Sequence, residues 1–171
     1  MNDGLRGFLV LALLSVAVSA LLAVVHDATT AQVAANRLKE RWRVAEALTG
    51  LPTLHETDSL PLPGTSIELP DHRRLIAAET RGYGGTISIL LLVDPDGLRG
   101  LRVVQHHETP GVADFIALPD SPWMQQFEAL PLIAAASLDT VSGATITTRA
   151  LRDTVARLAV RDDLPRAESA P

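Results

Sequence analysis

The sequence contains no cysteine. This absence excludes disulfide bonds, iron–sulfur clusters and thiolate metal sites held by this chain, and it excludes enzymes that use a thiol nucleophile. It does not indicate a cellular compartment, because a chain without thiols is stable under oxidising and reducing conditions alike. The redox compartment of the protein is therefore undecided from cysteine usage alone.

Aromatic residues are also scarce, at 4% of the chain, and the 15 lysine and arginine residues are scattered along it. Proteins that bind nucleic acid usually concentrate basic residues on one face and use aromatic rings to stack on bases. The formal net charge here is −5. We therefore expect no nucleic-acid partner.

Charged residues are absent from Gly7 to His26, where the sequence reads GFLVLALLSVAVSALLAVVH. A helix of about 20 residues spans about 30 Å, the thickness of the hydrocarbon layer of a bilayer. A buried core helix would show an apolar stripe, whereas this run is apolar on all sides. A cleaved signal peptide ending near AVSA (17–20) is the stronger alternative, but the apolar run continues beyond that point. We expect residues 1–27 to form one uncleaved transmembrane anchor.

The charges beside this span give a weak prediction of its orientation. One basic residue, Arg6, precedes the span, and the residues that follow it include Arg37, Lys39, Arg41 and Arg43. A simple positive-inside count puts the following domain in the cytoplasm, although a large domain can be translocated whatever its charges.

Residues 28–50 are predicted to form a connecting helix that leaves the membrane and packs on the domain. Thr29 or Thr30 can cap this helix and Gly50 can end it. Four prolines and one glycine in residues 51–72 favour a winding connector or short edge strands. The two histidines of this connector, His55 and His72, are expected to be exposed loop residues.

Three short apolar segments, 74–80, 85–93 and 98–106, are predicted to be strands of an antiparallel sheet. The sequence DPDG at 94–97 has proline and glycine where a tight turn needs them, and this predicts a hairpin between the last two strands. The glycine-rich sequence RGYGG at 81–85 connects the first two strands.

The rest of the chain is predicted to be mainly helical. A loop leads into a short helix around 121–129, which Ser121 can cap. Apolar residues recur at helical spacing from Ala150 to Ala159 and predict an amphipathic helix. The fold class is therefore α+β, with a transmembrane helix, a domain over 51–162 with an antiparallel sheet and packed helices, and a flexible tail at 163–171.

His106, His107 and Glu108 stand together and raise the possibility of a metal site. Adjacent residues of a strand point to opposite faces, so His106 and His107 cannot easily bind one ion together. No third and fourth ligand is evident. We expect no metal here, and solvated histidines beside a Thr-Pro-Gly turn are the simpler interpretation.

Hydroxyl side chains crowd the stretch DTVSGATITTRAL, residues 139–151, before the amphipathic helix. Gly143 permits close approach of the backbone, and the first N–H groups of a helix are unpaired and favour an anion. This local pattern predicts a phosphate or carboxylate site, and the alternative is an ordinary helix cap made by Thr147 or Thr148. The hydroxyls that can donate to phosphate oxygens are those of Ser142, Thr145, Thr147 and Thr148.

The segment DTVSGAT (139–145) fits the pattern Asp-x-x-Ser/Thr-Gly-Ala-Thr, and it resembles the covalent flavinylation signature of bacterial FMN-binding domains. In that family a flavin transferase joins the phosphate of FMN to the hydroxyl of the last threonine. The resemblance implies a phosphodiester between FMN and Thr145. It also implies that the recognition motif consists of Asp139, Ser142, Gly143 and Ala144.

Two further segments carry the same resemblance. GYGGTI (82–87) resembles the family's Gly-Tyr-x-Gly-x-Ile, and HHETPGVAD (106–114) resembles its His-x-Glu-Thr-Pro-Gly-Leu-Gly-Asp loop. With one N-terminal span before one such domain, the chain resembles the G subunits of Rnf-type (Rsx) ion-translocating electron transport complexes. Val112-Ala113 replaces the family's Leu-Gly, which predicts a stiffer loop. The resemblance implies a flavin pocket walled by Tyr83, Gly84, Gly85, His107, Glu108, Thr109, Pro110 and Gly111.

The function implied by the resemblance is that of a covalent-FMN electron carrier, an electron-transfer subunit rather than an enzyme on its own. Its implied partners are the other subunits of the complex, the flavin transferase and the bacterial inner membrane, with the FMN domain in the periplasm. No catalytic nucleophile or base is expected. The alternatives are a membrane-anchored periplasmic binding or scaffold domain without flavin, and a flavin-dependent reductase that acts directly on a small substrate.

Overall fold

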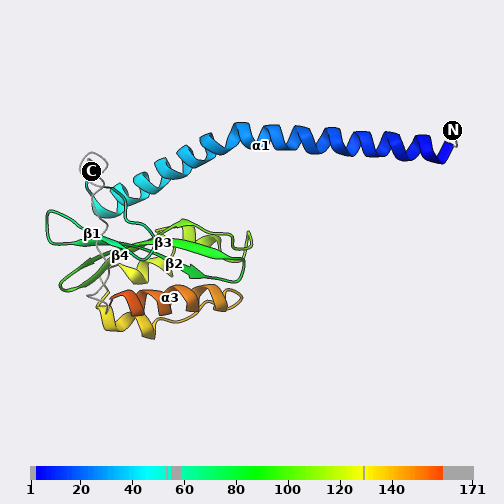
Figure 1. Cartoon of the computed structure of the whole chain (residues 1–171). Coiled ribbons are helices and arrows are strands. Elements are labelled where there is room, and N and C mark those ends of the chain that lie inside the picture. Colours follow the sequence, from blue (N-terminus) through cyan, green and yellow to red (C-terminus); the bar gives the residue numbers. More distant parts are fainter. Residues whose placement is uncertain (1–2, 53, 55–58, 129, 160–171) are drawn as a thin grey trace. The chain divides into compact units, whose positions relative to one another are not determined.

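The computed structural model describes residues 3–52, 54, 59–128 and 130–159. The chain divides into two compact units, residues 1–40 and the part from Arg41 onward. His55, the end of the predicted domain at 160–162 and the predicted tail at 163–171 lie outside the described residues. The elements, labelled in Figure 1, are α1 (Asp3–Thr49), β1 (Ser66–Glu68), β2 (Arg74–Arg81), β3 (Thr86–Asp94), β4 (Gly97–Gln105), three 3₁₀ turns (Asp114–Ala117, Met124–Phe127 and Leu132–Ser137) and α3 (Thr145–Ala159).

α1 is one continuous helix where two were predicted. The prediction that Thr29 or Thr30 caps a second helix is wrong, because both hydroxyls donate inside α1, to the carbonyls of Val25 (2.8 Å) and His26 (2.7 Å) respectively. Residues 28–40 contain no proline or glycine that would interrupt the helix. The helix ends as predicted at Gly50, which has a φ of 71°.

The N-terminal part of α1 has the properties of a membrane span. Its most apolar window has a mean hydropathy of 2.9, and none of that window is buried. Within the described part of the chain, α1 is the one helix long and apolar enough to cross a bilayer. Large apolar side chains from Leu5 to Val25 are exposed, which is favourable in lipid and costly in water.

The domain contains a four-stranded antiparallel sheet in the order β1-β2-β3-β4. The three predicted strands are confirmed, with bounds that differ by one residue at most. β1 is a short edge strand inside the connector 51–72, where its three residues pair with the start of β2. The short edge agrees with the prolines that surround it, since proline cannot donate to a sheet ladder.

The sheet lies between two apolar cores because successive side chains of a strand point to opposite faces. In β3, Leu90 and Leu92 face the last turns of α1, whereas Ile89 and Leu91 face α3 and the 3₁₀ turns. Figure 1 shows α3 (orange) lying along its face of the sheet. Other fully buried members of the core on the α3 side are Ile76, Ile87, Leu101, Phe127, Leu151 and Val155.

The predicted helix around 121–129 is wrong in length, because the chain makes only one 3₁₀ turn there, Met124–Phe127. Leu130 and Leu98 exchange two backbone hydrogen bonds of 2.9 Å, and this pairing draws the chain into an extended conformation. Ser121 still supports the turn, since its hydroxyl accepts from the N–H of Met124 at 3.3 Å. Pairing with β4 therefore outweighs the local preference for helix.

The predicted DPDG turn joins β3 to β4 and depends on the carboxylate of Asp94. That carboxylate accepts from the N–H groups of Asp96 (2.9 Å) and Gly97 (3.0 Å) and pairs with Arg99. Partial burial by itself raises the pKa of Asp94, but the hydrogen bonds from Arg99 and from the two N–H groups outweigh it and leave the pKa below the ordinary 3.8. The turn is therefore stabilised by the ionised form of Asp94.

The stabilisation by Asp94 should disappear in acid. Because the pKa of Asp94 is lower in the folded chain than the 3.8 of the unfolded chain, its contribution is present above pH 3.8 and is lost as the pH falls through the folded value. We expect Asp94→Ala to unfold at a lower temperature than wild type at pH 7, with a gap that closes below pH 3.8. Thermal melts over a pH series test this, with the exposed Asp120→Ala as control. A gap independent of pH would contradict it.

Candidate functional site

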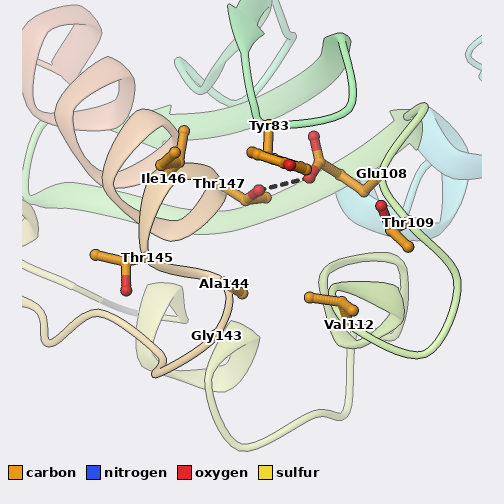
Figure 2. Close-up of a pocket in the computed structure, with 9 residues that line it drawn as sticks. All are labelled: Tyr83, Glu108, Thr109, Val112, Gly143, Ala144, Thr145, Ile146 and Thr147. Atoms are coloured by element: carbon orange, nitrogen blue, oxygen red, sulfur yellow. Dashed lines mark hydrogen bonds between the residues drawn. The ribbon is translucent and has the colours of Figure 1, made fainter.

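A cavity of about 560 Å³ opens beside the N-terminus of α3. Three segments that are distant in sequence surround it: the β2–β3 turn, the loop after β4, and the start of α3 with the turn before it. Figure 2 shows the side chains that these segments contribute. The lining residues are Tyr83, Glu108, Thr109, Val112, Gly143, Ala144, Thr145, Ile146 and Thr147.

The start of α3 is built by a tight turn over Val141–Ala144. Ala144 donates its N–H to the carbonyl of Val141 (3.0 Å), and Gly143 adopts a φ of 85° that favours glycine. The first helical hydrogen bond runs from the N–H of Thr148 to the carbonyl of Ala144 (2.9 Å). The N–H groups of residues 145–147 precede this bond, and the first turn carries no acidic side chain. This end of the helix therefore presents positive partial charge at the cavity.

Neither Thr147 nor Thr148 caps α3, because both lie inside its first turn, so the alternative of an ordinary cap by these residues is wrong. The hydroxyl of Thr148 is buried, accepts from the N–H of Val141 (3.2 Å) and donates to the carbonyl of Ala144 (3.0 Å). It fastens the preceding turn to the helix. The hydroxyl of Thr147 is also buried and donates to Glu108.

Thr145, the predicted attachment residue, is the first residue of α3 and lines the cavity. It is half-buried, and its hydroxyl donates to the carbonyl of Val141 over a long 3.4 Å. In Figure 2 its side chain lies on the other side of the first turn from Thr147. The oxygen of Thr145 is thus only weakly engaged, and a rotation about its χ1 would free it.

Asp139 and Ser142 belong to the predicted motif but do not line the cavity, and both are exposed. The backbone carbonyl of Asp139 accepts from the indole N–H of Trp123 at 2.8 Å, so this part of the motif is anchored to the core. In contrast, Gly143 and Ala144, the other two residues of the recognition motif, line the cavity. The motif therefore contributes one wall of the site and, on its outer side, an accessible surface.

The β2–β3 turn contributes Tyr83, whose side chain is 74% exposed at the cavity. Gly84 and Gly85 were predicted as lining residues but do not line it. Their role is steric, because a Cβ at Gly84 would lie 2.1 Å from the carbonyl oxygen of His107, and one at Gly85 would lie 3.3 Å from the His107 side chain. Glycine here lets the turn pack against the chain after β4.

Of the loop residues predicted to wall a flavin pocket, Glu108 and Thr109 line this cavity, whereas His107, Pro110 and Gly111 are exposed and lie outside it. Glu108 is 7% exposed. Its carboxylate accepts from the Thr147 hydroxyl at 2.6 Å and from the N–H of Gly84 at 3.1 Å. A buried carboxylate is tolerated when hydrogen bonds satisfy it in this way.

Two lining residues, Val112 and Ile146, were not predicted as site residues. Both are large apolar side chains with about half of their surface exposed, 49% and 55%. Val112 could have been found from its place in the HHETPGVAD segment, and Ile146 could have been found from its place directly after Thr145. Together with Tyr83 they make the rim of the cavity apolar.

His106 and His107, considered above as metal ligands, have different partners for their Nδ1 atoms. The Nδ1 atom of His106 accepts from the N–H of Glu108 (3.3 Å), and that of His107 lies 3.4 Å from the carbonyl oxygen of Thr86. In the described part of the chain, no three histidine or acidic side chains gather as metal ligands. The cavity itself, with its apolar rim and the N–H groups at the start of α3, is suited to an organic ligand with an apolar body and an anionic end.

Comparison with known proteins agrees with this geometry. Residues 82–160 match the family model of the FMN-binding domain. The chain is 30% identical to the G subunit of the ion-translocating oxidoreductase complex of Cereibacter sphaeroides, in an alignment covering 94% of this chain and 84% of that protein. The G subunit of Escherichia coli O157:H7 is 37% identical over 48% of this chain and 46% of its own length. That of Stutzerimonas stutzeri is 38% identical over 42% of this chain and 37% of its own.

Proposed function

Because the chain belongs to the family of ion-translocating oxidoreductase complex G subunits, we propose that it carries electrons on one FMN within such a membrane complex. The observation that carries the proposal is the cavity at the start of α3, which combines an apolar rim with free helix N–H groups. The other subunits of the complex are its partners. The chain serves as an electron-transfer subunit rather than as an enzyme on its own.

The residues that line the cavity fit both the ring system of FMN and its phosphate group. A cavity of about 560 Å³ is within the ordinary range for small organic ligands. Tyr83, Val112 and Ile146 offer apolar surface to a flat ring system. The N–H groups at the start of α3 favour a phosphate group, as helix N-termini do.

We further propose that the FMN is covalent, as a phosphodiester on the hydroxyl of Thr145, installed by a flavin transferase. Of the two threonines of α3 that line the cavity, Thr145 has a hydroxyl held by one long hydrogen bond, whereas the hydroxyl of Thr147 is committed to Glu108. A phosphodiester at the first residue of α3 would lie beside the free N–H groups, which stabilise its charge. The exposed Asp139 and Ser142 would then serve recognition by the transferase.

When bound, FMN supplies the electron transfer, because it accepts and releases one or two electrons. The protein would hold and orient it: the rim residues Tyr83, Val112 and Ile146 would contact its apolar surface. The N–H groups at the start of α3 would hold the phosphate. Glu108, whose oxygens are engaged by Thr147 and Gly84, keeps the walls together.

We propose that α1 anchors the chain in the inner membrane and that the FMN domain lies in the periplasm. The apolar part of α1 supports the anchor, and the family resemblance supports the periplasmic side. The basic residues that follow the span favour the opposite orientation. Their effect is outweighed here because a large domain is translocated largely regardless of charge.

The test is the intact mass of the full chain after expression with a flavin transferase. We expect a gain of one FMN less one water that survives denaturation and maps to a peptide containing Thr145. Two arms, with the transferase confined to the periplasm or to the cytoplasm, test the orientation, and modification only in the periplasmic arm is expected.

An unmodified chain, in cells where a control substrate of the same transferase is modified, would contradict the covalent flavoprotein and would favour a scaffold domain without flavin. Modification only in the cytoplasmic arm would contradict the orientation and leave the attachment intact.

A further inference from the structure

Glu108 lies where three segments of the domain meet, and its carboxylate is the group that joins them. We propose that Glu108 is a positioning residue, which fixes the first turn of α3 and thereby the hydroxyl of Thr145 at the cavity. We call the set Glu108, Thr147 and Gly84 the clasp. The consequence for Thr145 rests on the proposed function, whereas the clasp itself does not.

The bond from Thr147 to Glu108 is short and buried, whereas the bond from the exposed Gly84 is of ordinary length and partly buried. The 2.6 Å bond from Thr147 joins residues separated by 39 positions, and the 3.1 Å bond from Gly84 joins residues separated by 24. Glu108 and Thr147 are 7% and 1% exposed. A hydrogen bond to a charged group in such surroundings is among the stronger ones in a protein, and leaving one partner unsatisfied is costly.

The packing around the clasp leaves no room for a side chain at Gly82 or Gly84 as the turn stands. A Cβ at Gly82 would lie 2.1 Å from an oxygen of the Glu108 carboxylate. A Cβ at Gly84 would lie 2.1 Å from the backbone oxygen of His107. The absence of side chains at these two positions is what brings the β2–β3 turn within reach of Glu108.

The bond from Thr147 to Glu108 ties the first turn of α3 to a distant segment, the loop after β4. The leading N–H groups of this turn have no acceptor within the helix, and the turn has no acidic side chain of its own. The hydroxyl of Thr145 makes one long bond of 3.4 Å, to the carbonyl of Val141. Thr147 is in the same turn, so a bond that holds Thr147 also limits the movement of Thr145.

The clasp can position Thr145 through the geometry of its hydrogen bonds or through the charge of Glu108. The substitution Glu108→Gln distinguishes these two possibilities. The side-chain oxygen of glutamine can accept from Gly84, and its NH₂ group can donate to the Thr147 hydroxyl, which is also an acceptor. Glu108→Gln thus retains both bonds without the charge, whereas Glu108→Ala removes both. The proposal is that geometry is decisive, so Glu108→Gln should restore most of the attachment rate that Glu108→Ala loses.

The experiment compares two buried threonines of α3 in the full chain. Thr147→Val removes the bond to Glu108. The control Thr154→Val removes two bonds of 2.9 Å, one that the buried Thr154 hydroxyl donates to Thr80 and one that it accepts from Arg157. We expect Thr147→Val to slow FMN attachment about tenfold, Thr147→Ser to restore it, and Thr154→Val to leave it near the wild-type rate. The rate is measured by intact mass over time with purified transferase.

A second readout does not depend on FMN. In chains made without the transferase, hydrogen exchange is followed by mass spectrometry in peptides covering 82–87 and 144–149. Faster exchange in both peptides for Thr147→Val, and in neither for Thr154→Val, supports the clasp. Equal effects of the two variants on rate and exchange, or no effect of Thr147→Val, would overturn it. If wild type is never modified, the proposed function fails and the exchange data alone decide about the clasp.

Discussion

Chains carrying Thr145→Ala should contain no covalent FMN. The substitution removes the one oxygen that the proposed phosphodiester requires and leaves the rim residues Tyr83, Val112 and Ile146 in place. Alanine is also a good helix former, so the start of α3 should persist. Flavin that still enters the cavity would be released on denaturation, and intact mass after denaturation measures the difference from wild type.

Two matched variants separate loss of the attachment oxygen from disturbance of the motif. Thr145→Ser keeps a hydroxyl at the same position and should still be modified. Thr140→Ala removes a nearby hydroxyl from one of the variable positions of Asp-x-x-Ser/Thr-Gly-Ala-Thr and should be modified at the wild-type level. Covalent FMN in Thr145→Ala, on Ser142 or on another hydroxyl, would contradict the assignment of Thr145.

Gly84→Ala should destabilise the domain by on the order of 1–3 kcal/mol, the usual cost of forcing an extra group into a packed site. The added Cβ would lie 2.1 Å from the His107 carbonyl oxygen and 2.9 Å from the Glu108 Cα. Both are backbone atoms, so no side-chain rotation relieves the clash. The β2–β3 turn must move away, which also breaks the bond from Gly84 to Glu108. Thermal unfolding should show the loss of stability, and intact mass should show reduced FMN attachment.

Gly64→Ala is the control for an alanine introduced at a turn glycine. Gly64 has a φ of 84° and nothing within 4 Å of an added Cβ, so the substitution introduces only backbone strain of about 1 kcal/mol. It should lower the melting temperature modestly and leave FMN attachment unchanged. If Gly84→Ala were no more harmful than Gly64→Ala, the tight packing of the turn against the chain after β4 would be wrong.

The local sequence predicted those helices, strands and turns that depend mainly on residues close together in the chain. The run from Gly7 to His26 has no charged residue, and it became the apolar part of α1. The strand predictions were confirmed because β-branched and apolar residues lie between turn residues such as DPDG at 94–97. The start of α3 follows the small residues of the SGAT motif, since Gly143 provides the positive φ that the turn needs.

Contacts between distant segments decided what local sequence could not. Thr147 is a plausible helix cap by composition, yet its hydroxyl bonds to Glu108, 39 positions away. The predicted helix around 121–129 is a single turn because Leu130 pairs with Leu98.

Contacts between distant segments also decided which of the residues predicted to wall the pocket line the cavity. The motif segments named Gly84, Gly85, His107, Pro110 and Gly111, which lie outside the lining, and omitted Val112 and Ile146, which line it. The sequence by itself indicated which segments would lie together around the cavity, because their motifs are continuous along the chain. Only the tertiary structure decided which side chains face the cavity, because that depends on how three separate segments pack together.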